Sequence, residues 1–311
     1  MTDNKIITDR EEMLEAVRWN DLAFKFTNDI LKADREIVLE ALKHFGSHLE
    51  YVSDSLKSDS EVVLAAVKID GLALEFASGT LKADREIVLE AVKSNGAALR
   101  LADDALKADR EIVLEAVKNN GFALEFADDT YKADREIVLE AIQNIGWALQ
   151  YASDTLKADR EIVLEAVNHS GPALKSASDS LKADREVVLE AVKNWGSALQ
   201  FASDTLKSDR EVVLEAVKDN DIKGALQFAS DTLKADREVV LEAVKISGMA
   251  LVWTSDTLKD DREVVIEAVK MYVNAYKNST SDERSAAIRR LLKYASKELQ
   301  NDPELKKLAE G

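Results

Sequence analysis

The sequence has no cysteine, only two prolines and only three histidines among its 311 residues. Without cysteine, the chain can form no disulfide, no thiolate nucleophile and no cysteine-ligated zinc or iron–sulfur centre. It also lacks any run of the roughly 20 apolar residues that a membrane-spanning helix needs. Residues 1–9 lack the basic-then-apolar profile of a secretory signal peptide. We therefore expect a cytoplasmic protein, with export as an effector by a route that needs no such signal as the alternative.

Positive charge is scarce: 42 Lys and Arg residues stand against 59 Asp and Glu residues, and the net charge is -17. This charge opposes nucleic-acid phosphates and anionic lipid headgroups, so we expect neither nucleic-acid binding nor membrane insertion. The segment 270–311 differs, because its nine basic and six acidic side chains give a net charge of +3. The distribution favours a protein partner that carries a basic segment.

The chain repeats itself with an offset of 25 residues. Positions are numbered here from the opening residue of a copy, and the copy that starts at Leu106 reads LKADREIVLEAVKNNGFALEFADDT. Eleven copies follow one another from Ile6 onward, and one of them carries two extra residues within 219–224. The other copies open at Leu31, Leu56, Leu81, Tyr131, Leu156, Leu181, Leu206, Leu233 and Leu258. Such self-similarity is typical of a stacked-repeat protein.

Two positions mark where a helix begins and ends. Position 4 is aspartate in all eleven copies and directly precedes a helical pattern, which predicts a helix N-cap. Position 16 is glycine in eight copies, and lysine usually stands at position 13. We expect this glycine to end the helix in the left-handed conformation, with the lysine near the negative end of the helix dipole.

Between these marks the apolar arc is unusually wide. Positions 7, 8, 9, 11 and 12 are all apolar, and in the copy from Leu106 they are Ile112, Val113, Leu114, Ala116 and Val117. A helix with so wide an arc is expected to contact a neighbouring copy on each side as well as its own partner helix. The alanine at position 11 is present in every copy and would let neighbouring helices approach closely.

A second helical pattern of about two turns follows the glycine, with Ala123, Leu124 and Ala127 on its apolar side. A last short turn, capped by the aspartate at position 24, leads into the next copy. A unit this small cannot bury its own apolar surface, so its neighbours must cover the rest. The sequence therefore predicts an all-α protein, an α-solenoid of eleven roughly 25-residue two-helix repeats with terminal caps.

The predicted domain organisation is a helical repeat array over residues 1–277 and a C-terminal helical cap over residues 278–311. At the front, Glu12 replaces the usual Ile or Val, which fits a terminal copy with a solvated outer face. At the back, one amphipathic helix is expected from Ser281 or Asp282, and another from Asp302 and Pro303.

The phrase LKADREIVLEAVKxNGxALxFASDT resembles a family of short helical repeats catalogued as a domain of unknown function, number 4116. The resemblance covers nearly everything from Ile6 to Lys277. Such repeats are similar to α-solenoid units of the leucine-rich-repeat-variant type, and the resemblance implies an all-helical superhelix without an established activity. It brings no catalytic residues. The insertion around Ile222, Gly79 in place of an aspartate and the basic tail depart from the pattern.

Few residues offer chemistry. His44 and His48 lie four apart, but Gly46 should break the helix between them, and no carboxylate completes a zinc site. The aspartates at positions 4 and 24 resemble a ladder for calcium, yet each stands at a natural capping position. No phosphate-binding glycine loop, nucleophile elbow or histidine-carboxylate-serine set can be assembled. We predict no catalytic residue, no cofactor and no metal, and we do not expect an enzyme.

The copies differ most at positions 14, 15 and 17, the edge where the two helices meet. Aromatic side chains are common binding anchors, and solenoids usually bind through one extended face. The alternative is that these side chains only cap the core. The candidate partner-binding residues are Trp19, Phe45, Leu72, Phe122, Trp147, Trp195 and Met249.

A second column of aromatic residues stands at position 21. We predict that this column is part of the core. Its members include Phe76, Phe126, Tyr151, Phe201 and Phe228.

These features favour a non-catalytic protein–protein interaction scaffold that presents an acidic solenoid surface studded with aromatic residues. The first alternative is a structural spacer anchored by its basic C-terminal helices. The second alternative is an enzyme, which would need polar groups that converge on a cleft.

Overall fold

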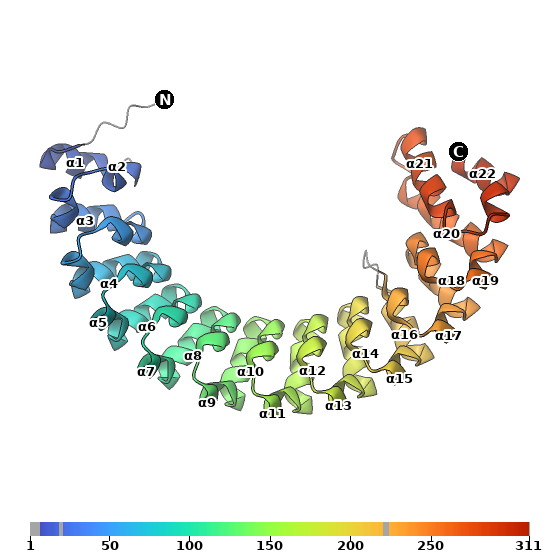
Figure 1. Cartoon of the computed structure of the whole chain (residues 1–311), viewed down its shortest axis with the longest axis horizontal. Helices are drawn as coiled ribbons and strands as arrows, with labels where there is room; N and C mark the ends of the chain where they lie inside the picture. The colour runs from blue at the N-terminus through green and yellow to red at the C-terminus, as the bar shows by residue number, and fades with distance from the viewer. Residues whose placement is uncertain (1–6, 19–20, 220–223, 311) are drawn as a thin grey trace. The chain divides into compact units, whose positions relative to one another are not determined.

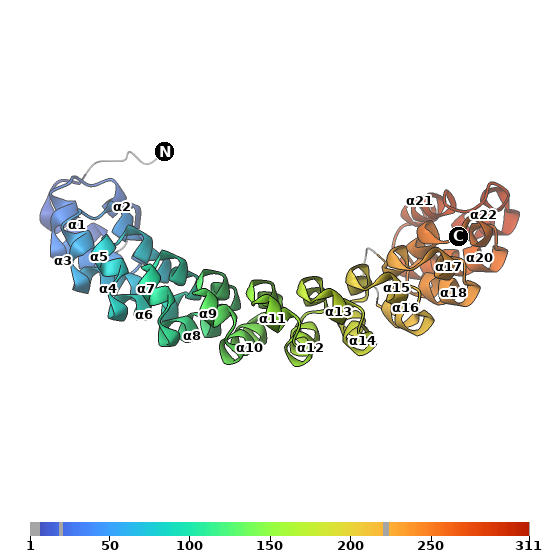
Figure 2. The same ribbon diagram turned by 60° about the horizontal axis from the view of Figure 1, so that its bottom comes forward.

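The computed structural model describes residues 7–18, 21–219 and 224–310. These residues form α-helices and 3₁₀-helices without any strand, which confirms the predicted all-α class. The chain divides into two compact units, residues 1–156 and 157–311. Within each unit the repeats stack side by side in chain order (Figure 1, Figure 2). None of the described helices combines the length and the apolar character that crossing a bilayer requires.

One repeat consists of two main helices and a short connecting helix. In the copy from Leu106 these are α8 (Arg110–Asn119), the 3₁₀-helix η6 (Gly121–Phe126) and α9 (Asp129–Lys132). The predicted second helix is therefore present with its two turns, but it is a 3₁₀-helix with three residues per turn. The predicted last turn is the short α-helix that opens the next copy.

In the N-terminal unit, the helix that follows the position-4 aspartate of each repeat, here called the leading helix, is an α-helix. These helices are α1 (Arg10–Ala16), α3 (Arg35–Leu42), α4 (Ser60–Ile69), α6 (Arg85–Ser94), α8 and α10 (Arg135–Asn144). The helices that follow them are α2 (Asp21–Lys25), η2 (Gly46–Tyr51), η4 (Gly71–Phe76), η5 (Gly96–Leu101), η6 and η7 (Gly146–Tyr151). The connecting helices are η1 (Leu31–Ala33), η3 (Leu56–Ser58), α5 (Gly79–Lys82), α7 (Asp104–Lys107), α9 and α11 (Asp154–Lys157).

The C-terminal unit follows the same plan and then departs from it. The leading helices are α12 (Arg160–His169), α14 (Arg185–Asn194), α16 (Arg210–Val217), α18 (Arg237–Ile246) and the longer α20 (Arg262–Ala275). The 3₁₀-helices are η8 (Gly171–Ser176), η9 (Gly196–Phe201), η10 (Ala225–Phe228) and η11 (Gly248–Trp253). The connecting helices are α13 (Asp179–Lys182), α15 (Asp204–Lys207), α17 (Asp231–Lys234) and α19 (Asp256–Lys259). The chain ends with α21 (Ser281–Leu292), η12 (Leu299–Asn301) and α22 (Pro303–Glu310).

The aspartate at position 4 is a helix N-cap, as predicted. Oδ1 of Asp109 accepts hydrogen bonds from the backbone N–H groups of Glu111 (3.0 Å) and Ile112 (3.2 Å). A cap of this kind stabilises a helix by about 1 kcal/mol. The same cap is made by Asp9, Asp34, Asp59, Asp84, Asp134, Asp159, Asp184, Asp209, Asp236 and Asp261.

The prediction of a left-handed glycine at position 16 is wrong. Among the described residues, Gly224 alone has a positive φ, 67°. The glycine at position 16 is needed instead for a close approach between repeats. A Cβ atom added to Gly121 would lie 2.3 Å from the carbonyl oxygen of Ala141, the position-11 alanine of the next repeat. Gly71 and Ala91 are related in the same way, at 2.2 Å. The glycine of one repeat and the invariant alanine of the next therefore form one contact.

Position 14 bridges adjacent repeats with two hydrogen bonds. Oδ1 of Asn119 accepts from the backbone N–H of Gly96 (2.7 Å), and its Nδ2 donates to the carbonyl of Lys93 (3.0 Å). Asn144 in the same unit and Asn194 in the C-terminal unit each make the equivalent pair. These bonds satisfy backbone groups that the tight packing removes from water.

A row of ion pairs runs along the leading helices within each unit. Nε of Arg85, at position 5, lies 2.8 Å from Asp109 of the next repeat, and its Nη2 lies 2.5 Å from Glu111. Ser60 replaces the arginine in the third copy and interrupts the row. The equivalent pairs start from Arg10, Arg35, Arg110, Arg160, Arg185, Arg210 and Arg237. Exposed pairs of this type contribute little individually.

The core lies between the leading helices and the 3₁₀-helices. In the copy from Leu106 the buried side chains are Ile112, Val113, Ala116, Val117, Ala123 and Leu124, all at 0% exposure. Leading helices contact the neighbouring leading helices on both sides, for example α6 with α4 and α8. This is the double contact that the wide apolar arc predicts.

The C-terminal helices extend the repeat geometry beyond the repeat sequence. Asp302 caps α22 by accepting from the N–H groups of Glu304 (2.8 Å) and Leu305 (3.0 Å). Arg262 of α20 contacts Asp302 (3.2 Å) and Glu304, so the ion-pair row reaches α22. Pro303 stands where the next arginine would be, and the row ends there. The two helices predicted in this segment are confirmed, with Thr280 as the N-cap of α21.

Candidate protein-binding face

The 3₁₀-helices of each unit lie side by side and expose one set of side chains. Positions 18, 19 and 22 point into the core, as Ala123, Leu124 and Ala127 show. Positions 17 and 20 share the opposite side of the 3₁₀-helix and lie mostly at the surface, while position 21, one turn after the buried position 18, remains partly exposed. We call the surface formed by positions 15, 17, 20 and 21 of the 3₁₀-helices the 3₁₀ face. It contains most of the predicted edge residues.

In the N-terminal unit this face exposes three large candidates. Phe45 is 44% exposed, Phe122 38% and Trp147 37%. Leu72 lies at the same position as Phe122 but is half-buried. The Phe122 ring meets the ring of Tyr151, from position 21 of the next repeat, edge-on with centroids 6.2 Å apart. A position-17 side chain thus packs against a position-21 side chain of the following repeat.

A second aromatic group lies at the start of the N-terminal unit. The His48 ring lies 5.3 Å from Phe45 and 6.2 Å from Tyr51, measured between ring centroids. It also lies 6.0 Å from the buried ring of Phe24 on α2. Nζ of Lys25 stands 5.3 Å from the centroid of the Tyr51 ring. His48 is therefore part of an aromatic cluster.

In the C-terminal unit the candidate side chains differ in how exposed they are. Met249 is 39% exposed. Trp195 is half-buried, and its ring lies 6.5 Å from that of Phe201. Trp253, at position 21 of η11, is 41% exposed and was not among the predicted binding residues. Trp19 lies outside the described residues.

The prediction that the position-21 aromatic residues belong to the core is wrong. Trp253 is exposed, and the members named above are half-buried at the surface of the 3₁₀-helices. The core is already filled by the small and leucine side chains at positions 18, 19 and 22. The sequence could have predicted this surface position, because three apolar positions are enough to form the buried side of a two-turn helix. The 3₁₀ face therefore also includes the aromatic side chains at position 21, namely Phe76, Phe126, Tyr151, Phe201 and Phe228.

Charge on the 3₁₀ face differs between the units. Position 20 is Glu50, Glu75, Arg100, Glu125 and Gln150 in the successive 3₁₀-helices of the N-terminal unit, and Glu75 lies 3.8 Å from Arg100. Burial, together with the Glu125 carboxylate, raises the pKa of Tyr151, whose hydroxyl then donates to that carboxylate at neutral pH. In the C-terminal unit position 20 is Lys175, Gln200, Gln227 and Val252. Carboxylates thus flank the aromatic residues mainly in the N-terminal unit.

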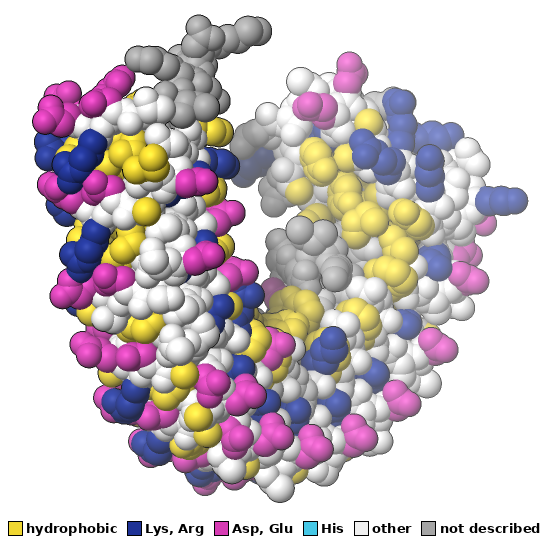
Figure 3. Space-filling model, turned by 60° about the vertical axis from the view of Figure 1, so that its left-hand side comes forward, with side chains coloured by type: hydrophobic (Ala, Val, Ile, Leu, Met, Phe, Trp, Pro, Cys, Tyr) yellow, Lys and Arg dark blue, Asp and Glu magenta, His cyan; other side chains and the backbone are white. Residues whose placement is uncertain are grey.

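Most other carboxylates already have structural partners. The aspartates at position 24 extend into solvent beside the lysine at position 2, as Asp104 and Lys107 do at 2.9 Å. Within the described residues, no three His, Asp or Glu side chains are grouped so as to hold a metal ion. In Figure 3, acidic and basic side chains alternate over the repeats, whereas Lys and Arg gather at the C-terminal end. The position-4 aspartates therefore cap helices, but the prediction that position 24 caps the last turn is wrong. Asp103, at position 23, is the N-cap of α7, and Asp104 is the first residue of that helix and pairs with Lys107.

Comparison with known proteins agrees with this architecture. No curated protein matches the chain. Seven segments match a family described as a domain of unknown function, DUF4116, and they cover residues 9–46, 34–82, 84–132, 134–182, 184–234, 221–258 and 236–283. Most of these segments span about two copies of the repeat. The chain belongs to the DUF4116 family.

Proposed function

We propose that the protein is a non-catalytic scaffold that binds a protein partner along the 3₁₀ face. The observation that carries this proposal is the recurrence of exposed large apolar side chains at positions 15, 17 and 21. Phe45, Phe122 and Trp147 supply them in the N-terminal unit, and Met249 and Trp253 in the C-terminal unit. Exposed aromatic side chains on a rigid backbone are good interface anchors, because they bury much area at low entropic cost.

Charge supports a partner with a basic segment. Glu50 and Glu75 stand on the N-terminal part of the face, in the same 3₁₀-helices as Tyr51 and Phe76. A basic segment laid across these helices would meet carboxylates beside aromatic rings, which also attract cations through their faces. The Lys25 ammonium group already makes such a cation–π contact with the Tyr51 ring. We therefore place the basic part of the partner on the N-terminal unit.

The assignment as non-catalytic rests on how the recurring polar residues are used. Asp109 caps a helix and pairs with Arg85, and Glu111 completes the same ion pair. Asn119 bridges two repeats. The polar residues that recur from copy to copy hold the stack together, and the residues that vary are the exposed ones on the 3₁₀ face.

The test compares proteins captured from a lysate by the wild-type chain and by matched variants. Replacing Phe122→Ala together with Trp147→Ala should remove specific partners, and Trp147→Ala with Trp195→Ala should weaken them. Tyr294→Ala is the control, because Tyr294 is 41% exposed but lies outside the 3₁₀-helices. Quantitative mass spectrometry of the captured proteins measures the change. A partner recovered equally by all variants would contradict the proposal.

A second candidate function, a spacer anchored by its basic end, is favoured by the surface of α21. Arg289, Arg290 and Lys293 are exposed there. Neutralising them with glutamine tests this candidate better than deleting 278–311, because the deletion also removes the helix cap Asp302 and the buried Leu305. Attachment that is lost in the glutamine variant and unchanged in Trp147→Ala would favour the spacer over the scaffold.

A further inference from the structure

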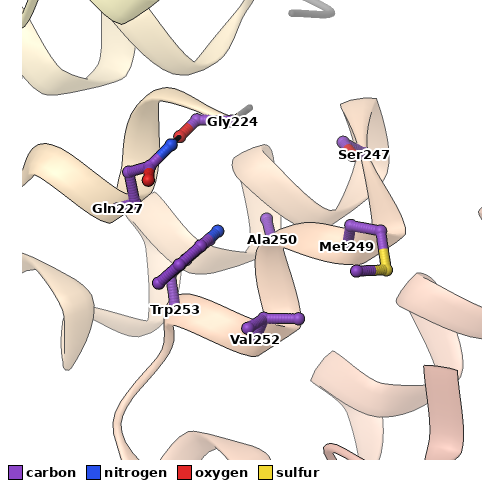
Figure 4. A pocket seen from close by; sticks show the side chains of 7 residues that line it. All are labelled: Gly224, Gln227, Ser247, Met249, Ala250, Val252 and Trp253. Atoms are coloured by element: carbon purple, nitrogen blue, oxygen red, sulfur yellow. Dashed lines mark hydrogen bonds between the residues drawn. The ribbon is translucent and has the colours of Figure 1, made fainter. Parts of the chain in front are cut away.

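The C-terminal unit contains a hollow between η10 and η11, on the 3₁₀ face. It has a volume of about 200 Å³. Gly224 and Gln227 line one side, and Ser247, Met249, Val252 and Trp253 line the other. Figure 4 shows the Trp253 indole on the side that faces Gln227 and Gly224. None of these lining side chains is charged, so the hollow favours an uncharged apolar group.

One earlier repeat shows what can fill this place. Counted back from Phe228 at position 21, Gly224 stands at position 17, where an earlier repeat has Phe122. The Phe122 ring packs edge-on against Tyr151 at position 21 of the next repeat. The residue that corresponds to Tyr151 in the pocket is Trp253. The hollow therefore occupies the position that the Phe122 ring takes in the other unit. It lies beside the exposed Trp253, which has no such ring packed against it within the described part of the chain.

The backbone conformation of Gly224 leaves the hollow unfilled by the described residues. Gly224 has φ 67°, which other L-residues rarely adopt, and a Cβ atom added to it would meet none of the described atoms within 4 Å. The carbonyl of Gly224 accepts a hydrogen bond from Nε2 of Gln227 (3.2 Å), which fixes this wall. Gly224 thus contributes no side chain at position 17.

We propose that this pocket binds one aromatic side chain, of phenylalanine size, from the partner protein. The proposal deepens the scaffold function and rests on it for the source of the side chain. An apolar cavity of roughly 150 Å³ is enough to hold a benzene ring, so the volume fits a single ring. Ser247 stands at the rim without capping η11, whereas Asn120 caps η6 at the same position.

The direct test uses N-acetylphenylalaninamide as the probe and the methionine methyl groups as reporters. The chain has four methionines, and Met249 lines the pocket while Met13 is fully buried in the N-terminal unit. In methyl NMR spectra of the full chain, the probe should shift Met249 saturably, with a dissociation constant on the order of 1 mM, and leave Met13 unchanged. N-acetylalaninamide should not produce the shift. A Met249 signal that responds equally to both probes, or to neither, would overturn the proposal.

Two variants sharpen this test. Trp253→Ala should weaken the probe at least tenfold, whereas Tyr294→Ala, which removes an aromatic side chain of the same 41% exposure outside the 3₁₀-helices, should leave its affinity unchanged. Replacing residues 221–224 with Gly-Phe restores the repeat phrase as KDNGFALQF, with glycine and phenylalanine at the positions of Gly121 and Phe122. The new phenylalanine should fill the pocket and abolish the probe shift. Retained probe binding in this variant, with its melting temperature at or above that of the wild type, contradicts the proposal.

The probe experiment and the capture experiment test the pocket and the scaffold function independently. If the probe shifts Met249 but no partner depends on the 3₁₀ face, the pocket stands and the scaffold function falls. If partners depend on Trp147 but the probe leaves Met249 unchanged, the scaffold function stands and the pocket falls.

Discussion

The backbone of Gly121 faces the carbonyl oxygen of Ala141 in the next repeat so closely that a Cβ atom on Gly121 would lie 2.3 Å from that oxygen. The obstacle is backbone, which cannot rotate away as a flexible side chain can. The spacing between adjacent repeats is therefore set at this point by the absence of a side chain. The same relationship recurs between Gly196 and Ala216 in the C-terminal unit, at 2.2 Å.

Gly121→Ala should destabilise the protein by about 2 kcal/mol, because the added methyl forces two repeats apart. The midpoint of urea unfolding measures the change. Gly79→Ala is the matched control, since a Cβ atom at the exposed Gly79 meets nothing within 4 Å and its φ is not positive. That substitution should be neutral or stabilise by up to about 1 kcal/mol. Equal effects of the two substitutions would show that close approach is not the reason for the glycine.

Asn119→Ala should destabilise by roughly 1–3 kcal/mol, because it removes two hydrogen bonds between repeats and leaves the Gly96 N–H without its acceptor. Asn119→Asp should cost less, because a carboxylate can still accept from that N–H. Asp219 does so for Gly196, at 2.8 Å. Hydrogen exchange of the Gly96 amide distinguishes the variants: it should stay protected in Asn119→Asp and lose protection in Asn119→Ala. Protection that persists in both would contradict the bridging role.

The sequence predicted the parts of the fold that depend on local physics. The N-cap at Asp109, the end of the helix before Gly121 and the wide apolar arc follow from spacing alone. The role of Gly121 could not be predicted, because its reason lies in the backbone of another repeat. The function of Asn119 was hidden for the same reason, since its partners are 23 and 26 residues away.

The candidate face was predicted in part. The exposure of Phe122 and Trp147 agrees with the sequence pattern, but the aromatic column at position 21 was assigned to the core. That error comes from treating the second helix as an ordinary amphipathic helix. Small alanine and leucine side chains at positions 18, 19 and 22 fill the core, so the larger aromatic side chains at position 21 remain partly exposed. The pocket at Gly224 could not be predicted, because it depends on how the chain re-enters the repeat after the insertion.

Arg85→Gln should raise the pKa of Asp109. In the wild type the hydrogen bond from Arg85 is the main influence that lowers this pKa; burial opposes it, and the N–H of Ile112 adds to it. A carboxyl with a lowered folded-state pKa stabilises the fold above its unfolded pKa of about 3.9, and this stabilisation is lost as the pH falls through the folded value. Wild type should therefore be more stable than Arg85→Gln at pH 5–7, and the difference should vanish in stronger acid. Urea unfolding across this pH range, with NMR titration of the Asp109 carboxyl, measures both effects. A stability difference that does not change with pH would contradict this linkage.

Leu305→Ala tests whether α22 serves as the terminal unit of the stack. Leu305 is fully buried, and α22 contacts both α20 and α21, so losing its side chain should cost about 2–5 kcal/mol locally. In a stacked-repeat protein each unit is stabilised by its neighbours, so the loss should appear first next to the substitution. We expect hydrogen exchange to accelerate in α20 and α21 and to remain unchanged in α4 and α6 of the N-terminal unit. Lys307→Ala, at an exposed position of the same helix, should leave exchange in α20 as in the wild type. Unchanged protection of α20 in Leu305→Ala would mean that the array is complete without α22, and that residues 296–310 serve a purpose other than covering its end.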